Sequence, residues 1–136
     1  DLGLCAAMES LSREFAMMGI FELEYKSDNI EQYEIRPEAA ICVFRVLQEA
    51  LNNIAKHAAA RNVCVKFIKD AGDFVLEVSD DGRGFSEEAL VGKQGFGIIG
   101  MGERAALCGG AVEIYSKPGQ GTRVVMTVPS RSSQGD

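Results

Sequence analysis

The segment covering residues 37–59 carries polar side chains at a spacing that could serve chemistry. Glu49, Asn53, Lys56 and His57 lie on one side of a helix that turns by ~100° per residue. The opposite side carries an apolar stripe, made of Phe44, Leu47, Leu51, Ile54 and Ala58. The polar side could bind a ligand through its carboxylate, amide and cationic groups, or it could be a solvated helix face.

A first glycine-rich box, Asp80-Asp81-Gly82-Arg83-Gly84-Phe85, follows the apolar run of residues 74–78. The oxygen atoms of an ionised Asp80 can only accept hydrogen bonds, so they suit the exocyclic amine of a base. Gly82 and Gly84 have no Cβ atom, which lets a flat ring lie close to the backbone. An ordinary turn after a strand has the same composition, so this box alone leaves both interpretations open.

A second box, Gly95-Phe96-Gly97-Ile98-Ile99-Gly100, leads directly into a predicted helix that ends near Cys108. Glycines at a helix start predict a phosphate site, because free N–H groups and the positive end of the helix dipole point at the anion. A dinucleotide-binding fold would place such a box directly after a buried strand. Residues 86–94 are instead polar and acidic, with Gly92 among them, which predicts a mobile loop.

The order of these segments resembles the ATP-binding catalytic domain that histidine kinases share with type II topoisomerases, heat-shock ATPase chaperones and mismatch-repair ATPases. Within that superfamily, the sequence is most similar to the nitrate-sensor/DesK-like group of bacterial sensor histidine kinases. The resemblance extends over residues 1–129. It rests on four phrases, at residues 48–58, 80–85, 97–104 and 116–122.

The resemblance implies ATP and Mg²⁺ as ligands, and it implies a role for the residues of the polar helix side. Asn53 matches the family's Mg²⁺-binding asparagine, whose amide oxygen suits an ion that takes its other ligands from phosphates and waters. Glu49 lies one turn earlier, where relatives place either a general base or an acid near the metal. Lys56 and His57 match positions near the phosphates, although a structural role stays open for His57.

The remaining candidates are assigned by the same resemblance to the base and the phosphates. Asp80 should accept a hydrogen bond from the adenine N6 amine, with Thr122 supporting it through a water molecule. Gly82 and Gly84 should allow close approach to the base. The backbone at three glycines should wrap the phosphates, namely Gly95, Gly97 and Gly100. Arg104 either reaches a phosphate or forms an ion pair on the helix surface.

The implied reaction is transfer of the γ-phosphoryl group of ATP to a histidine, which depends on positioning and charge neutralisation. The only histidine of this chain is His57, on the nucleotide-binding helix. The resemblance therefore implies an acceptor on a preceding dimerisation domain of a homodimeric parent protein, with a response regulator downstream. The isolated chain should not phosphorylate itself. An ATPase switch and a serine-kinase regulator of the same superfamily remain the alternative functions.

The composition is that of one globular domain of 136 residues, with 46% hydrophobic and 25% charged residues. A net charge of −6 disfavours nucleic acid as a partner, because such a surface would need a basic patch. No apolar run approaches ~20 residues, so we expect a cytoplasmic domain whose parent can still be anchored in a membrane. Cys5, Cys42, Cys64 and Cys108 form no CxxC pair, which predicts buried reduced thiols.

The hydrophobic periodicity predicts three helices and five strands. Helices are expected at residues 2–18, 37–59 and 98–108, and strands at 21–25, 62–68, 74–78, 111–116 and 122–128. They predict a two-layer α/β sandwich, in which three helices cover one face of a mixed, mostly antiparallel sheet of about five strands. Residues 28–33 are expected to be a polar connection. The ATP-binding domain should end at residue 129, and residues 130–136 should form a disordered tail.

Overall fold

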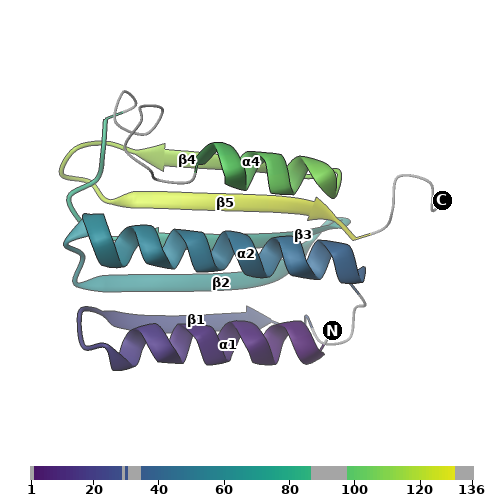
Figure 1. Cartoon of the computed structure of the whole chain (residues 1–136), viewed down its shortest axis with the longest axis horizontal. Coiled ribbons are helices and arrows are strands. Elements are labelled where there is room, and N and C mark those ends of the chain that lie inside the picture. The colour runs from purple at the N-terminus through teal and green to yellow at the C-terminus, as the bar shows by residue number, and fades with distance from the viewer. Residues whose placement is uncertain (1, 29, 31–34, 87–97, 131–136) are drawn as a thin grey trace.

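A five-stranded sheet forms one layer of the protein, and helices α1, α2 and α4 form the other (Figure 1). The computed structural model describes residues 2–28, 30, 35–86 and 98–130. The helices are α1 Leu2–Met17, α2 Pro37–Asn53, the short π-helix η2 Ile54–Ala58, and α4 Ile98–Leu107. The strands are β1 Glu22–Asp28, β2 Asn62–Asp70, β3 Asp73–Asp80, β4 Ala111–Ser116 and β5 Thr122–Pro129. The predicted two-layer α/β sandwich is confirmed.

The strands follow the order β1-β2-β3-β5-β4 in the sheet. β1 is parallel to β2, whereas the β2–β3, β3–β5 and β4–β5 pairs are antiparallel. The register places Asp80, the last residue of β3, opposite Thr122, the first residue of β5. The sheet is therefore mixed and mostly antiparallel, as predicted, and it brings two candidate site residues side by side at one end.

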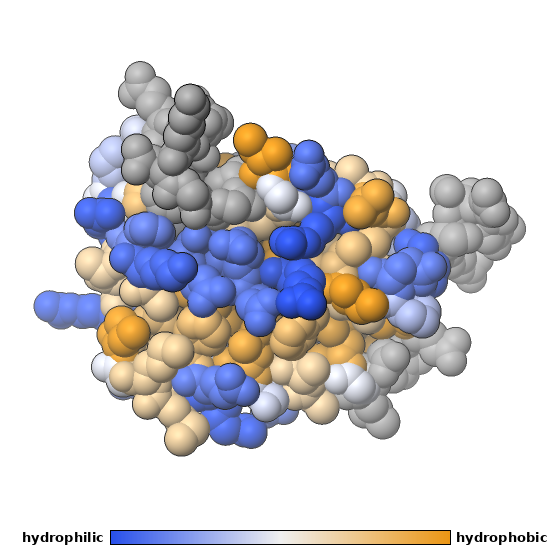
Figure 2. Space-filling model, in the orientation of Figure 1, coloured by the Kyte–Doolittle hydropathy of each residue, from blue (hydrophilic) through white to orange (hydrophobic). Residues whose placement is uncertain are grey.

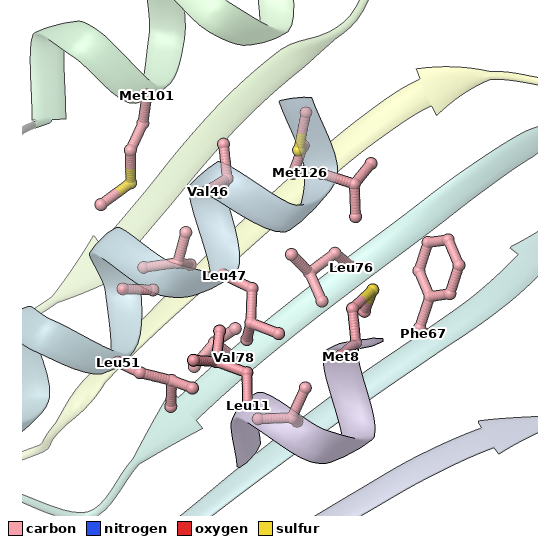
Figure 3. Packing of buried hydrophobic residues seen from close by; sticks show 14 of the residues in the cluster. Met8, Leu11, Val46, Leu47, Leu51, Phe67, Leu76, Val78, Met101 and Met126 are labelled. Carbon is pink, nitrogen blue, oxygen red and sulfur yellow. The ribbon is translucent and has the colours of Figure 1, made fainter. Parts of the chain in front are cut away.

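Alternating burial along the strands explains why helices cover one face of the sheet. In β3, Phe74, Leu76 and Val78 are buried, whereas the residues between them are only partly buried. A strand of this pattern presents one apolar face, which is stabilised when helices remove it from water. Met8 of α1 and Leu47 of α2 are fully buried against it, and Figure 3 shows both side chains in one cluster with Leu76.

The buried face of α2 is wider than the predicted apolar stripe. It includes four residues that the stripe omits, Ala39, Val43, Val46 and Ala50. Phe44, which belongs to the predicted stripe, is only half-buried, because it lines a shallow groove together with Leu4 of α1. A helix between two others buries more than one narrow stripe, and α2 packs against both α1 and α4.

The end of this helix differs from the predicted regular helix over residues 37–59. The α-helix ends at Asn53 and continues as the π-helix η2, after which Ala59 adopts a left-handed conformation with φ 52°. A π-helix has i→i+5 hydrogen bonds and a wider turn, so Lys56 and His57 are rotated from the positions of a regular helix. The assumption of ~100° per residue is therefore wrong beyond Asn53.

Two segments predicted to be irregular contain anchored residues. Ile30, within the predicted polar connection, is fully buried. Ser130, within the predicted disordered tail, donates a backbone hydrogen bond to the Gly72 carbonyl at 2.9 Å. Composition cannot reveal such anchors, because one apolar side chain or one backbone N–H does not change the polarity of a segment. Residues 31–34 and 131–136 lie outside the described residues.

Two of the four thiols meet between α2 and α4. Sγ of Cys108 lies 2.8 Å from Sγ of Cys42, and burial raises the pKa of the Cys108 thiol to about 11. All four cysteines are free thiols, and Cys5 and Cys108 are buried as predicted. Cys42 and Cys64 are only partly buried, which the sequence pattern does not predict.

Hydrophilic residues form a band across the middle of the helix-covered face, over α2 (Figure 2). Large apolar side chains remain exposed at scattered positions, which include Met17, Ile41, Ile99 and Leu107. Single exposed apolar residues are normal on a protein surface. None of the helices within the described residues combines the length and the apolar character needed to cross a membrane.

Candidate functional site

A cavity lies where α2 and the π-helix η2 meet the ends of β3 and β5. Three candidate residues contribute its polar side chains, Asn53, Asp80 and Thr122. The other lining residues are Ala50, Ile54, Ala58, Val78, Phe85, Ile114 and Val124. The lining combines apolar side chains with a few convergent polar groups, as small-molecule sites do. Its free volume is about 20 Å³, so a base can enter only if lining side chains move. The fold thus joins the polar helix side with the first glycine-rich box and the last hairpin.

Asp80 is held at the end of β3 by backbone donors. Its Oδ1 atom accepts a hydrogen bond from the N–H of Gly82 at 2.7 Å. Burial raises the pKa of this carboxyl and the charge of Asp81 adds to the increase, whereas the N–H groups of Gly82 and Thr122 lower it. A half-buried carboxylate fixed in this way is a directed hydrogen-bond acceptor facing the cavity.

Asp81 fastens the first box to the start of β2. Its carboxylate accepts hydrogen bonds from the N–H of Arg61 at 2.9 Å and from the N–H and the Nδ2 of Asn62, both at 2.8 Å. These bonds, the backbone N–H of Asn62 first, lower the pKa of Asp81. No role of Asp81 is predicted from the sequence. A second aspartate after a strand is nevertheless a signal, because aspartate side chains commonly bind nearby backbone N–H groups.

The glycines of the first box are required because the backbone crosses itself there. The Arg83 N–H donates to the Ala58 carbonyl at 2.7 Å, which ties the box to the end of η2. A Cβ atom on Gly82 would collide with the Ala58 carbonyl oxygen, and one on Gly84, at φ +67°, would collide with the Lys117 carbonyl oxygen. Close approach to a base stays a prediction, and these contacts are a separate reason for glycine.

Ser116, at the end of β4, connects the first box with the turn before β5. Its Oγ atom accepts a hydrogen bond from the Phe85 N–H at 2.8 Å. The same atom lies 3.1 Å from the Gly121 carbonyl oxygen and 2.7 Å from Thr122 Oγ1. The sequence analysis gives only Thr122 a role in this hairpin. A serine hydroxyl beside a glycine turn is a weak signal, because such residues usually stabilise the turn itself.

Three further candidates on the helix lie outside the lining of this cavity. Glu49 is half-buried on α2, one turn before Asn53. Lys56 is exposed on η2. His57 is half-buried, and its ring meets the Phe85 ring edge-on with the centroids 6.5 Å apart. His57 therefore packs against a wall of the cavity, while Glu49 and Lys56 are neighbours of Asn53 along the chain.

Only the end of the second glycine-rich box belongs to the described part of the chain. Gly95 and Gly97 lie outside it, as do residues 87–94 of the predicted mobile loop. The box opens α4 as predicted, with Gly100 near its start and Arg104 exposed in its last turn. Nothing stands within 4 Å of a Cβ atom placed on Gly100. The described residues therefore supply no steric reason for glycine at that position.

The polar groups of the site fit a hard cation that brings most of its own ligands. Among the described residues, no group of three or more His, Cys, Asp or Glu side chains could hold a metal ion. Mg²⁺ commonly takes one or two protein oxygens and completes its octahedron with phosphates and waters. The amide of Asn53 in the cavity and the carboxylate of Glu49 one turn away offer that small number.

Known proteins match this chain over most of its length. The family described as "Histidine kinase-, DNA gyrase B-, and HSP90-like ATPase" matches residues 39–132. The signal transduction histidine-protein kinase/phosphatase DegS of Brevibacillus brevis is 36% identical over 132 residues, which cover 95% of this chain and 33% of the relative. The sensor histidine kinase MctS of Rhizobium johnstonii is 34% identical, over 98% of this chain and 29% of the relative. The chain thus spans about a third of the length of these curated relatives.

Solved structures confirm the fold. The histidine kinase domain of the blue-light activated histidine kinase from Erythrobacter litoralis EL346 has a TM-score of 0.76 at 22% identity, over 93% of this chain and 60% of that one. Another structure of that kinase has a TM-score of 0.72 at 20% identity, over 95% of this chain and 45% of that one. The matched family and relatives confirm the resemblance to the ATP-binding catalytic domain of sensor histidine kinases. The chain belongs to the histidine kinase-, DNA gyrase B- and HSP90-like ATPase family.

Proposed function

We propose that this chain binds ATP with Mg²⁺ and supplies the γ-phosphoryl group to a histidine on another domain of its parent protein. The observation that carries the proposal is the cavity, because it joins the carboxylate of Asp80 and the amide of Asn53 in one apolar space. A base needs an acceptor such as the carboxylate, and a metal-bound phosphate tail needs an oxygen ligand such as the amide. The family and the sensor-kinase relatives support the same ligand and the same class of reaction.

The adenine ring is assigned to the apolar part of the cavity. Asp80 accepts a hydrogen bond from the N6 amine, and Thr122, its neighbour across the strand pair, supports the amine through a water molecule. A hydrogen bond to a charged group contributes about 1.5–3 kcal/mol. Ile54, Val78 and Ile114 of the lining exclude water from the ring, which strengthens that bond.

The phosphates are assigned to the Asn53 end of the cavity. Mg²⁺, when bound, neutralises the charge that develops between the β- and γ-phosphates. The amide oxygen of Asn53 would hold the ion, and Glu49 would orient a water beside it. Side-chain donors would come from Lys56, His57 and Arg104. Backbone N–H donors would come from the second glycine-rich box, at Gly95, Gly97 and Gly100.

The proposed transfer needs an acceptor in line with the γ-phosphate. An imidazole nitrogen attacks the γ-phosphorus, the bond to the β–γ bridging oxygen breaks, and ADP leaves as phosphohistidine forms. His57 is half-buried against Phe85 on η2, directly after the helix that ends at Asn53, so we assign it to the side of the nucleotide and not to the in-line acceptor position. The acceptor is therefore assigned to a dimerisation domain of a homodimeric parent, from which a response regulator receives the phosphoryl group.

Asn53→Ala should weaken binding of Mg·ATP by at least about tenfold, a loss typical of removing even an outer partner of a metal site. Binding of metal-free ADP should change much less, because the amide serves the ion. Titration calorimetry with and without Mg²⁺ measures both affinities. Asn52→Ala is the matched control, because the neighbouring amide is also half-buried but is absent from the cavity lining. Equal losses with and without Mg²⁺ would remove Asn53 from the metal.

A further inference from the structure

Three side chains of the site form one row across three neighbouring strands. Asp80 of β3 pairs with Thr122 of β5, and Thr122 pairs with Ser116 of β4. Asp80 and Thr122 both line the cavity, and the hydroxyls of Thr122 and Ser116 are 2.7 Å apart. Paired residues on one face of a sheet interact directly. Ser116 can therefore act on the base site through Thr122.

The hydrogen-bond inventory of Ser116 fixes the direction of that contact. A serine hydroxyl has one proton to donate and two lone pairs to accept with. The Phe85 N–H can only donate, so it occupies one lone pair, and the Gly121 carbonyl can only accept, so it takes the proton. The remaining contact is satisfied when Thr122 donates its own proton into the second lone pair of Ser116.

This direction determines what Thr122 presents to the cavity. Its single proton is used on Ser116, so its hydroxyl oxygen offers only lone pairs to a ligand or a bridging water. The Asp80 carboxylate beside it also offers only lone pairs. Both groups then accept from a 6-amino group, and neither can donate to a 6-carbonyl group. A water that bridges Asp80 and Thr122 donates its two protons to them and also offers only lone pairs, so a 6-carbonyl oxygen there would lack a donor, which is costly.

We propose that Ser116 is a positioning residue that holds Thr122 as a hydrogen-bond acceptor and thereby makes the site select 6-aminopurine over 6-oxopurine nucleotides. The inference rests on the proposed function, because it assumes that the base lies beside Asp80 and Thr122. Ser116 also holds the backbone of Phe85, whose ring lines the cavity. Removing Ser116 therefore also disturbs the structure of the site, which should lower the affinities for ATP and GTP alike. Only the effect on the Thr122 hydroxyl should change the ratio of the two affinities.

The test is the ratio of ATP to GTP affinity in wild type, Ser116→Ala and Ser116→Cys, measured by competition binding with Mg²⁺ present. Without Ser116, the Thr122 proton is free to reach a 6-carbonyl oxygen, so the ratio should fall by roughly three- to tenfold. A cysteine side chain has the shape of serine but accepts hydrogen bonds only weakly, so Ser116→Cys should also lower the ratio. This variant serves as the test if Ser116→Ala does not fold. Ser116→Thr retains a hydroxyl, so its ratio of ATP to GTP affinity should equal that of the wild type. Ser79→Ala is the matched control, because Ser79 directly precedes Asp80 at the end of β3.

A double-mutant cycle sharpens the result. Once Thr122→Val has removed the Thr122 hydroxyl, adding Ser116→Ala should no longer change the ratio. Equal losses of ATP and GTP affinity in Ser116→Ala and Ser116→Cys would overturn the inference and leave Ser116 with a structural role only. Wild-type protein that binds neither nucleotide would instead overturn the proposed function, so the two failures are distinct.

Discussion

Asp80→Asn should weaken ATP binding by about 10- to 150-fold. The carboxylate is held by the Gly82 N–H at 2.7 Å and faces the cavity. Its loss removes a charge-assisted hydrogen bond of about 1.5–3 kcal/mol, at about tenfold in affinity per 1.4 kcal/mol. The preference for ATP over GTP should also narrow, because an amide can donate to a 6-carbonyl group. Competition binding measures both effects, and an unchanged ATP/GTP ratio would show that Asp80 does not read the base.

The same variant should not lose stability in the absence of nucleotide. The pKa of Asp80 is raised in the folded state, chiefly by burial. A carboxyl with a raised folded pKa contributes stability at pH values below its unfolded pKa, and that contribution is lost as the pH rises through the folded pKa. At neutral pH the ionised Asp80 therefore opposes folding. Asp80→Asn should melt at or above the wild-type temperature while binding ATP poorly.

Asp81→Asn is the control, for which the opposite change in melting temperature is expected. Its pKa is lowered by donors at Arg61 and Asn62, so its charge contributes stability above the unfolded pKa, which is lost only in acid. This variant should melt below wild type at neutral pH. Thermal unfolding of both variants without ligand measures the contrast. If Asp80→Asn melted lower than Asp81→Asn, Asp80 would be a structural residue and not one held in place for a ligand.

Gly82→Ala should abolish measurable ATP binding and lower the free energy of unfolding by about 1–3 kcal/mol, the usual cost of overpacking. A Cβ atom there would meet the Ala58 carbonyl and would lie 2.8 Å from Asp80 Oδ1. It would therefore separate the box from η2 and displace the acceptor carboxylate at once. Calorimetry with ATP and thermal unfolding measure the two effects.

Gly102→Ala is the matched glycine control. Gly102 lies within α4, and no atom of the described residues stands within 4 Å of a Cβ atom placed on it. Alanine favours a helix by about 0.5–1 kcal/mol over glycine, so this variant should be as stable as wild type or more stable. If Gly82→Ala bound ATP as Gly102→Ala does, the crossing of the box over η2 would not position the site.

The arrangement of the site follows largely from patterns that the sequence shows. Apolar periodicity predicts the strand that ends at Asp80 and the helix that carries Asn53, because burial of one face of each element is the main source of stability. Motif order predicts that these two residues meet, and the cavity contains both. Thr122 lies at the same cavity because β5 is paired with β3 in a register that sets Thr122 opposite Asp80.

Other features depend on contacts that no local pattern encodes. The π-helix η2 ends at Ala58, whose carbonyl accepts a hydrogen bond from the Arg83 N–H. Periodicity at a fixed angle per residue cannot show such a local widening. The contact between Cys42 and Cys108 depends on how α2 and α4 are packed. The proposed role of Ser116 depends on three groups meeting at its hydroxyl oxygen, whereas its residue type alone indicates only a turn.

Incubation with γ-labelled ATP, with and without a separately supplied dimerisation domain of the parent protein, tests whether this chain transfers the γ-phosphoryl group to a histidine on another domain. Acid and base treatment then separates phosphohistidine, which is labile in acid, from phosphoserine. We expect acid-labile label on the added domain and none on this chain, because its only histidine, His57, lies on η2 with its ring against Phe85 and is assigned to the nucleotide side of the proposed site. Acid-labile label on this chain that disappears in His57→Gln, with ATP binding retained, would contradict it.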